Sequence, residues 1–118
     1  MMTKLIEEVK EMVEREYGRA GAQFGLTNNS DHESYAVLLE EFQEAQTEVG
    51  TVDDKMSVFW GLVKANGGPE TKFNVLKSME GAAILAACEL IQVAAMAKKA
   101  ALTVCDQVEG GVLYEPYK

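Results

Sequence analysis

The sequence has few of the residues that build disulfide frameworks, zinc sites and basic nucleic-acid surfaces. Its 118 residues include two cysteines, one histidine and two prolines. There are nineteen acidic residues and only eleven basic ones. Cys88 and Cys105 stand in helix-like sequence, where they would lie about 25 Å apart on one helix, too far for a disulfide. Two cysteines are also too few for a zinc site. The net charge of −8 argues against a nucleic-acid polymer as partner.

Targeting and membrane-spanning segments are also missing from the pattern. The N-terminal residues MMTKLIEEVKEMVERE are charged throughout and lack the apolar stretch of a signal peptide. The longest apolar run, from Gly81 to Ala97, carries Glu89 and Gln92 at its centre and is slightly short for a membrane span. Together with two reduced thiols, this predicts a cytoplasmic protein with no membrane partner.

The apolar residues that are present recur mainly at helical spacing. Hydrophobic residues make up 47% of the chain, and its length suits one domain over residues 1–118 with its own core. Glycines and capping residues divide the helical sequence, so we expect an all-α bundle of about four helices. The first expected helix covers 4–17 and is ended by Gly18, and a loop over 18–30 follows it. Two helices come next, one over 31–49 capped by Ser30 and one over 52–65 capped by Thr51. After a break over 66–69 we expect a helix from 70 to about 105 and an extended tail over 110–118.

The segment 81–97 predicts self-association. Its polar residues are Glu89 and Gln92 alone, and a helix that is apolar on every side must be buried on every side. A monomer of this size offers few such positions, although one central helix is the simpler alternative. Many of the remaining residues are alanines, which allow another helix to approach closely. We therefore expect a homo-oligomer that completes the helical bundle.

Acidic residues at helical spacing indicate a metal site. Glu41 and Glu44 lie on one strip of their helix, which taken alone is typical of a solvated acidic face. Glu89 changes this interpretation, because an unpaired buried carboxylate costs several kcal/mol unless a partner or a metal neutralises it. Glu41, Glu44, Glu89 and Gln92 together offer the oxygen ligands that Mg²⁺ or Mn²⁺ prefers. The alternative is an ion pair for Glu89 and a core hydrogen bond for Gln92.

Two motifs in order resemble those of MazG-like all-α nucleoside triphosphate pyrophosphohydrolases of the small phage and bacterial type. The first is E-E-x-x-E over residues 40–44 and the second is Glu89-x-x-Gln92, and the resemblance extends over roughly residues 16–104. It implies a dimer or tetramer that cleaves nucleoside triphosphates to the monophosphate and pyrophosphate with Mg²⁺ or Mn²⁺. By motif position, Glu41 and Glu44 are the catalytic acids, and they bind the metal with Glu89. Gln92 occupies the fourth ligand position, where the family has an acid.

Other residues are candidates for substrate binding. Lys98 and Lys99 are candidates for contact with a phosphate, and Trp60 for stacking on a base. The simpler alternatives are lysines solvated at a helix C-terminus and an aromatic residue in the core. Two further hypotheses about function remain: a catalytically weak relative that binds nucleotide or metal, which the glutamine at position 92 favours, and a purely structural helical oligomer.

Overall fold

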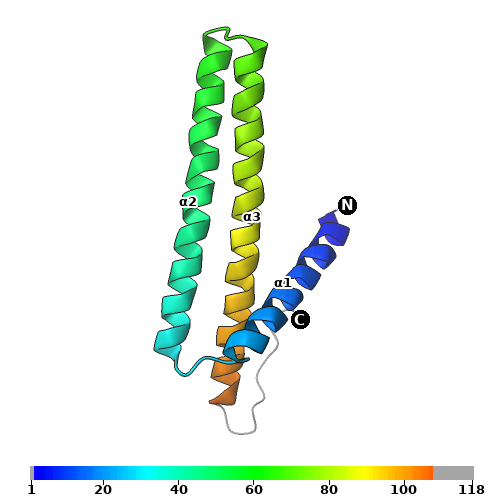
Figure 1. Ribbon diagram of the computed structural model, residues 1–118, viewed down its shortest axis with the longest axis vertical. Helices are drawn as coiled ribbons and strands as arrows, with labels where there is room; N and C mark the ends of the chain where they lie inside the picture. The colour runs from blue at the N-terminus through cyan, green and yellow to red at the C-terminus, as the bar shows by residue number, and fades with distance from the viewer. Residues whose placement is uncertain (1, 108–118) are drawn as a thin grey trace. The chain divides into compact units, whose positions relative to one another are not determined.

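The computed structural model describes residues 2–107, and these form helices joined by two short connections (Figure 1). The predicted all-α class is confirmed. The sequence predicts about four helices, and the described residues form three. The expected tail over 110–118 lies outside the described residues. The three helices are α1 (Met2–Phe24), α2 (Asp31–Lys64) and α3 (Pro69–Asp106).

α1 does not end at Gly18 as predicted but continues to Phe24. A Cβ atom at Gly18 would meet nothing within 4 Å, so no turn or close approach requires a glycine there. One glycine inside a helix costs only about 1 kcal/mol, which the neighbouring turns outweigh. The helix ends instead where Gly25 adopts φ +93° and its N–H donates to the carbonyl of Gly21 at 2.9 Å. The connection to α2 is therefore shorter than the predicted loop.

The two helices predicted over 31–49 and 52–65 are one continuous helix, α2. Gly50 has open space around its Cβ position, as Gly18 does, and does not interrupt the helix. Thr51, predicted to cap a new helix, donates its hydroxyl to the carbonyl of Thr47 at 3.2 Å. This bond to the preceding turn is typical of a threonine inside a helix. The predicted boundary at 50–51 is therefore wrong.

The helix ends that the sequence marks more strongly lie where they are expected. The hydroxyl of Ser30 accepts the backbone N–H of Glu33 at 3.1 Å, which confirms the N-cap of α2. After α2, Asn66 adopts φ +55° and the N–H of Gly67 donates to the carbonyl of Leu62 at 2.8 Å. This is a Schellman C-terminus. Pro69 then takes the first position of α3, where no N–H is needed.

The chain divides into two compact units, and the first contains α1. Its described residues are 2–40 and 91–107. Hydrogen bonds join α1 and the connection after it to the later part of α3. Gln92 donates its Nε2 to Glu16 Oε2 at 2.7 Å, and the N–H of Asn28 donates to Thr103 Oγ1 at 2.8 Å. The buried apolar side chains of this unit are Val13, Ala20 and Ala95.

The second unit, residues 41–90, is a helical hairpin. The later part of α2 and the earlier part of α3 run side by side in opposite directions, joined by the turn over 65–68 (Figure 1). Its buried apolar residues are the alanines Ala45, Ala82 and Ala86, and no large side chain is fully buried anywhere in residues 2–107. The two helices therefore approach closely through small residues and leave their large apolar side chains in contact with solvent.

α3 also has the length and composition of a membrane-crossing helix. An 18-residue window of it has a mean hydropathy of 1.5, and 17% of that window is buried. One such helix is weak evidence, because the core helix of a soluble protein passes the same test. The expectation of a chain without a membrane partner, which rests on Glu89 and Gln92, therefore stays a prediction.

Candidate metal centre

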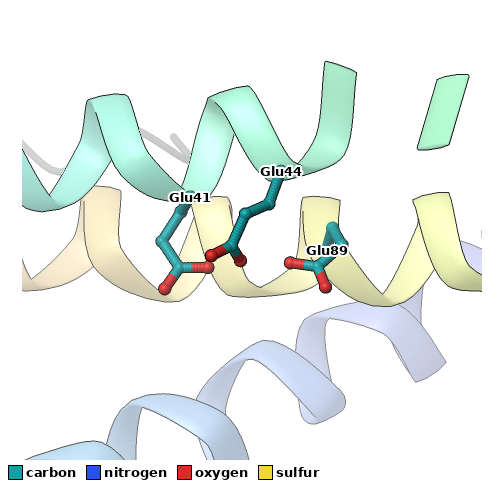
Figure 2. A group of neighbouring side chains, drawn as sticks. All are labelled: Glu41, Glu44 and Glu89. Atoms are coloured by element: carbon teal, nitrogen blue, oxygen red, sulfur yellow. The ribbon is translucent and has the colours of Figure 1, made fainter. Parts of the chain in front are cut away.

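Three glutamates converge within the hairpin of residues 41–90. α2 supplies Glu41 and Glu44, and α3 supplies Glu89 (Figure 2). One carboxylate oxygen from each residue lies within 4.8 Å of the other two. The structure therefore brings together three of the four residues that the sequence predicted as metal ligands.

The positions of these acids follow from helix spacing and from the small residues beside them. Glu41 and Glu44 are three residues apart, which puts them on one side of α2. Ala45 is 1% exposed, and Ala86 is buried on α3 one turn before Glu89. Because alanines occupy the contact, the two helices come close enough for glutamate side chains to span the remaining distance. Glu41 and Glu89 are half-buried, whereas Glu44 is exposed.

The electrostatics of the cluster oppose full ionisation. The pKa of Glu44 lies above its usual value of 4.5, first because its carboxyl shares a hydrogen bond with that of Glu89. Desolvation and the charge of Glu89 raise it further. Two carboxylates this close repel each other, and this repulsion opposes the ionisation of Glu44. A divalent cation bound between the two groups would offset this repulsion and leave both of them ionised.

The donor set fits a small hard cation. Mg²⁺ binds oxygens at about 2.0–2.1 Å, so two oxygens of one octahedral shell are roughly 2.9 to 4.2 Å apart. The limit of 4.8 Å that bounds the three carboxylate oxygens is only slightly wider, and rotation about glutamate side-chain bonds covers the difference. Three carboxylate ligands leave about half of an octahedral shell for water or phosphate oxygens. Glu41, Glu44 and Glu89 are thus residues that could hold Mg²⁺ or Mn²⁺.

Gln92, predicted as the fourth ligand, has a defined partner in the unit that contains α1. Its Nε2 donates to Glu16 at 2.7 Å, and Arg19 donates to the same carboxylate oxygen from Nη2 at 2.8 Å. These bonds, Arg19 first, hold the pKa of Glu16 below its usual value. This contact agrees with the alternative interpretation of Gln92 as a hydrogen-bonding residue, and its role as a metal ligand stays a prediction. Glu16 was not singled out from the sequence, where it resembles the other acids of α1.

The predicted substrate-binding residues lie in different surroundings. Lys98 pairs with the carboxylate of Glu14, and its Nζ lies 5.2 Å from the centre of the Tyr17 ring. Lys99 is only 6% exposed. Trp60 is 58% exposed and therefore not a core residue of the described chain. Lys98 thus has a structural role within its unit, and contact of these residues with a nucleotide stays a prediction.

A scan against models of protein families found no match for this chain. Searches among curated proteins and among solved structures found none either. The arrangement of Glu41, Glu44 and Glu89 is therefore the main ground on which a function is assigned.

Proposed function

We propose that the chain is a metal-dependent nucleoside triphosphate pyrophosphohydrolase that uses Mg²⁺ or Mn²⁺. Its substrate would be a ribo- or deoxyribonucleoside triphosphate, and its products the monophosphate and pyrophosphate. The observation that supports this is the convergence of Glu41 and Glu44 with Glu89. These acids come from two separate motifs, and each motif resembles the corresponding one of MazG-like enzymes.

The three acids have distinct parts in this proposal. Glu41 and Glu89 are half-buried, so they are suited to fix the position of a cation. A bound divalent cation supplies charge neutralisation of the triphosphate and lowers the pKa of a coordinated water. Glu44 is exposed, so its carboxylate is suited to reach a water molecule held by the cation. A Glu44 oxygen therefore orients the attacking water and accepts its proton.

The composition supports a small anionic substrate in the cytoplasm. With a net charge of −8, the chain repels polyphosphates unless a cation lies between them. A free nucleotide carries its own Mg²⁺, whereas a nucleic-acid polymer depends on a basic protein surface. A nucleoside triphosphate therefore fits this protein better than a polymer does.

A second candidate is a relative that binds metal or nucleotide with little turnover. Gln92 favours it, because an amide stands where the family has an acid and that amide donates to Glu16. The third hypothesis, a structural protein with Glu89 in an ion pair, is less well supported. Within residues 2–107 none of the described ion pairs includes Glu89, and the carboxyl group that shares a hydrogen bond with it belongs to another acid, Glu44.

Pyrophosphate release separates the three hypotheses. The assay uses a panel of ribo- and deoxyribonucleoside triphosphates with Mg²⁺ or Mn²⁺, on the parent chain and on two variants. We expect turnover in the parent, a loss of at least a hundredfold in Glu89→Gln, and near-parent turnover in Glu48→Gln, which changes the same group outside the cluster. If the parent binds Mn²⁺ but no triphosphate is cleaved, the second candidate replaces the first. If it neither binds nor cleaves, the structural hypothesis is left.

A further inference from the structure

A hollow of about 470 Å³ lies along the first half of α1, in the unit that contains this helix. Apolar side chains of α1 line most of it, and one alanine contributes from α3. Their spacing of three and four residues puts the side chains from α1 on one side of that helix. We call this hollow the α1 groove, and its apolar lining consists of Met2, Leu5, Ile6, Val9, Val13 and Ala94.

The groove is covered at one end of its lining and open at the other. Val13 is 8% exposed, whereas Leu5 and Ile6 are 52% and 47% exposed. Beyond Val13, polar contacts hold α1 to α3, since Glu14 pairs with Lys98 and Gln92 donates to Glu16. Residues 2–13 make up only about three turns, and a helix of that length is marginal in water unless its apolar side is buried. The stability of this part of α1 therefore depends on what covers the groove.

The sequence beyond the described residues supplies apolar side chains. Residues 108–118 read VEGGVLYEPYK, in which a glycine pair is followed by Val112, Leu113 and Tyr114 in succession and then by Tyr117. Segments that remain in solvent are typically poor in aromatic and branched apolar residues. The composition of 112–117 therefore indicates a segment with a packing partner.

The length of this segment fits the position of the groove. Gln107 is the last described residue, and Ala94 lies thirteen residues earlier on α3, which is about 20 Å along the helix. An extended chain covers about 3.4 Å per residue, so it reaches that distance at Leu113. From Leu113 to Tyr117 it covers roughly 14 Å more, close to the 17 Å or so between Met2 and Val13 along α1. The glycine pair at 110–111 allows the chain to reverse its direction after α3.

Size and attachment both favour this segment as the occupant. A hollow of 470 Å³ is near the lower end of the range for small-molecule sites, so it takes a few side chains rather than a whole helix. A segment of the same chain is present at an effective concentration of about millimolar, which a separate partner does not have. We propose that residues 113–117 pack in the α1 groove, with Leu113, Tyr114 and Tyr117 as the anchoring side chains.

Tyrosine suits a groove of this kind, because its ring packs on apolar side chains while its hydroxyl reaches water. The polar residues of the lining, Lys10 and Glu14, are exposed and belong to the same stretch of α1. The acidic cluster belongs to the other unit, residues 41–90. Packing of the segment and hydrolysis of a triphosphate are therefore separate properties, and either one can fail without the other.

Nuclear Overhauser effects in the full parent chain test the contact directly. We expect effects between the ring protons of Tyr114 or Tyr117 and the methyl groups of Leu5, Ile6 or Val9. Their absence overturns the proposal. A mixture of isotope-labelled and unlabelled chains shows whether the contact lies within one chain. Effects that arise between labelled and unlabelled chains would assign the segment to another copy and would overturn the proposal as well.

Amide hydrogen exchange of two serine variants gives a matched comparison. Leu113→Ser removes an anchoring side chain, whereas Val108→Ser changes an aliphatic residue next to Gln107, about 20 Å short of the groove. We expect exchange at residues 5–13 to be at least about tenfold faster in Leu113→Ser, parent-like in Val108→Ser, and unchanged over residues 41–90 in both. Equal exchange in all three proteins contradicts the proposal, and so does faster exchange over the whole of Leu113→Ser.

A free peptide provides the complementary test. The peptide GGVLYEPYK, added at millimolar concentration to Leu113→Ser, should restore slow exchange at residues 5–13. The same peptide with serine in place of its leucine should not. Equal effects of the two peptides, or no effect of either, contradict the proposal. If Leu113→Ser fails to fold, the Overhauser effects of the parent decide.

Discussion

Two acidic sites in this protein have the same residue type and opposite electrostatics. Glu16, in the unit that contains α1, accepts hydrogen bonds from Arg19 and Gln92, and its pKa lies below the usual value. Glu44, in the hairpin, has Glu89 as its strongest influence, and its pKa lies above the usual value. The fold itself supplies donors for Glu16, whereas it brings a second acid to Glu44. The first arrangement stabilises a helix contact, and the second is the one that a divalent cation would stabilise.

Among the substitutions that distinguish the two acidic sites, the largest change in the free energy of unfolding is expected at Gln92. In Gln92→Asp the amide that donates to Glu16 is replaced by a second carboxylate, which loses a hydrogen bond to a charged group and adds repulsion. We expect a decrease of about 1–3 kcal/mol in the free energy of unfolding, measured by urea titration. Gln92→Met, which removes the amide without adding charge, should decrease it less.

The same measurement with excess Mg²⁺ shows whether Gln92 acts through Glu16 or through the metal site. If Gln92 acts only through Glu16, excess Mg²⁺ should stabilise the parent and Gln92→Asp to the same extent. If Mg²⁺ stabilises Gln92→Asp more than it does the parent, the side chain at 92 belongs to the metal site, by mass action on the folded state. That result would place Gln92 in the group with Glu41, Glu44 and Glu89 and would make its bond to Glu16 secondary.

Neutralising Glu16 or Glu44 is expected to change the stability by a smaller amount, and in opposite directions at the two sites. The lowered pKa of Glu16 contributes stability above the usual value of 4.5, and this is lost as the pH falls through the folded-state pKa. The raised pKa of Glu44 favours the folded state only at low pH, and that contribution is lost as the pH rises through the folded-state pKa. Without metal at pH 7, Glu16→Gln should therefore lower the melting temperature and Glu44→Gln should raise it slightly.

Melting curves of both variants from pH 3 to pH 8 check this prediction. Both differences from the parent should shrink as the pH falls, that of Glu44→Gln first because the pKa of Glu44 is raised, and that of Glu16→Gln at lower pH because the pKa of Glu16 lies below 4.5. A Glu44→Gln variant that is less stable than the parent at pH 7 in the presence of a chelator would show that the fold needs this charge. The distinction between the two acidic sites would then be lost.

The helix ends show which local signals the sequence carries reliably. At 66–69 an asparagine, two glycines and a proline coincide, and the backbone there adopts a left-handed conformation at Asn66. Gly18 and Gly50 are single glycines in otherwise helical sequence. The penalty of about 1 kcal/mol for each is too small to end a helix whose adjoining turns gain from continuing. The same reasoning explains why Gly25, which closes α1 at φ +93°, was not distinguished from Gly18.

The candidate site was predictable where spacing alone determines it. Glu41 and Glu44 had to share one side of a helix, and Glu89 in an apolar segment was expected to have a charged or metal partner; the structure places it beside the acids Glu41 and Glu44, and the metal stays a prediction. The partner of Gln92 was not predictable, because an amide both donates and accepts and its choice depends on where α1 docks. The surroundings of Lys98 and Lys99 depend on the same tertiary contacts, which no local pattern specifies.

Binding of Mn²⁺, followed by electron paramagnetic resonance of the free ion, tests the central claim most directly. It reports on the cluster without requiring a substrate. We expect one Mn²⁺ site per chain in the parent, displaced by excess Mg²⁺ and unchanged in Glu48→Gln. In Glu89→Gln, which removes one of the three proposed charged ligands, the affinity should be at least tenfold weaker. No bound Mn²⁺ at millimolar concentration, or equal binding in Glu89→Gln and the parent, would contradict the assignment of Glu41, Glu44 and Glu89 as a metal centre.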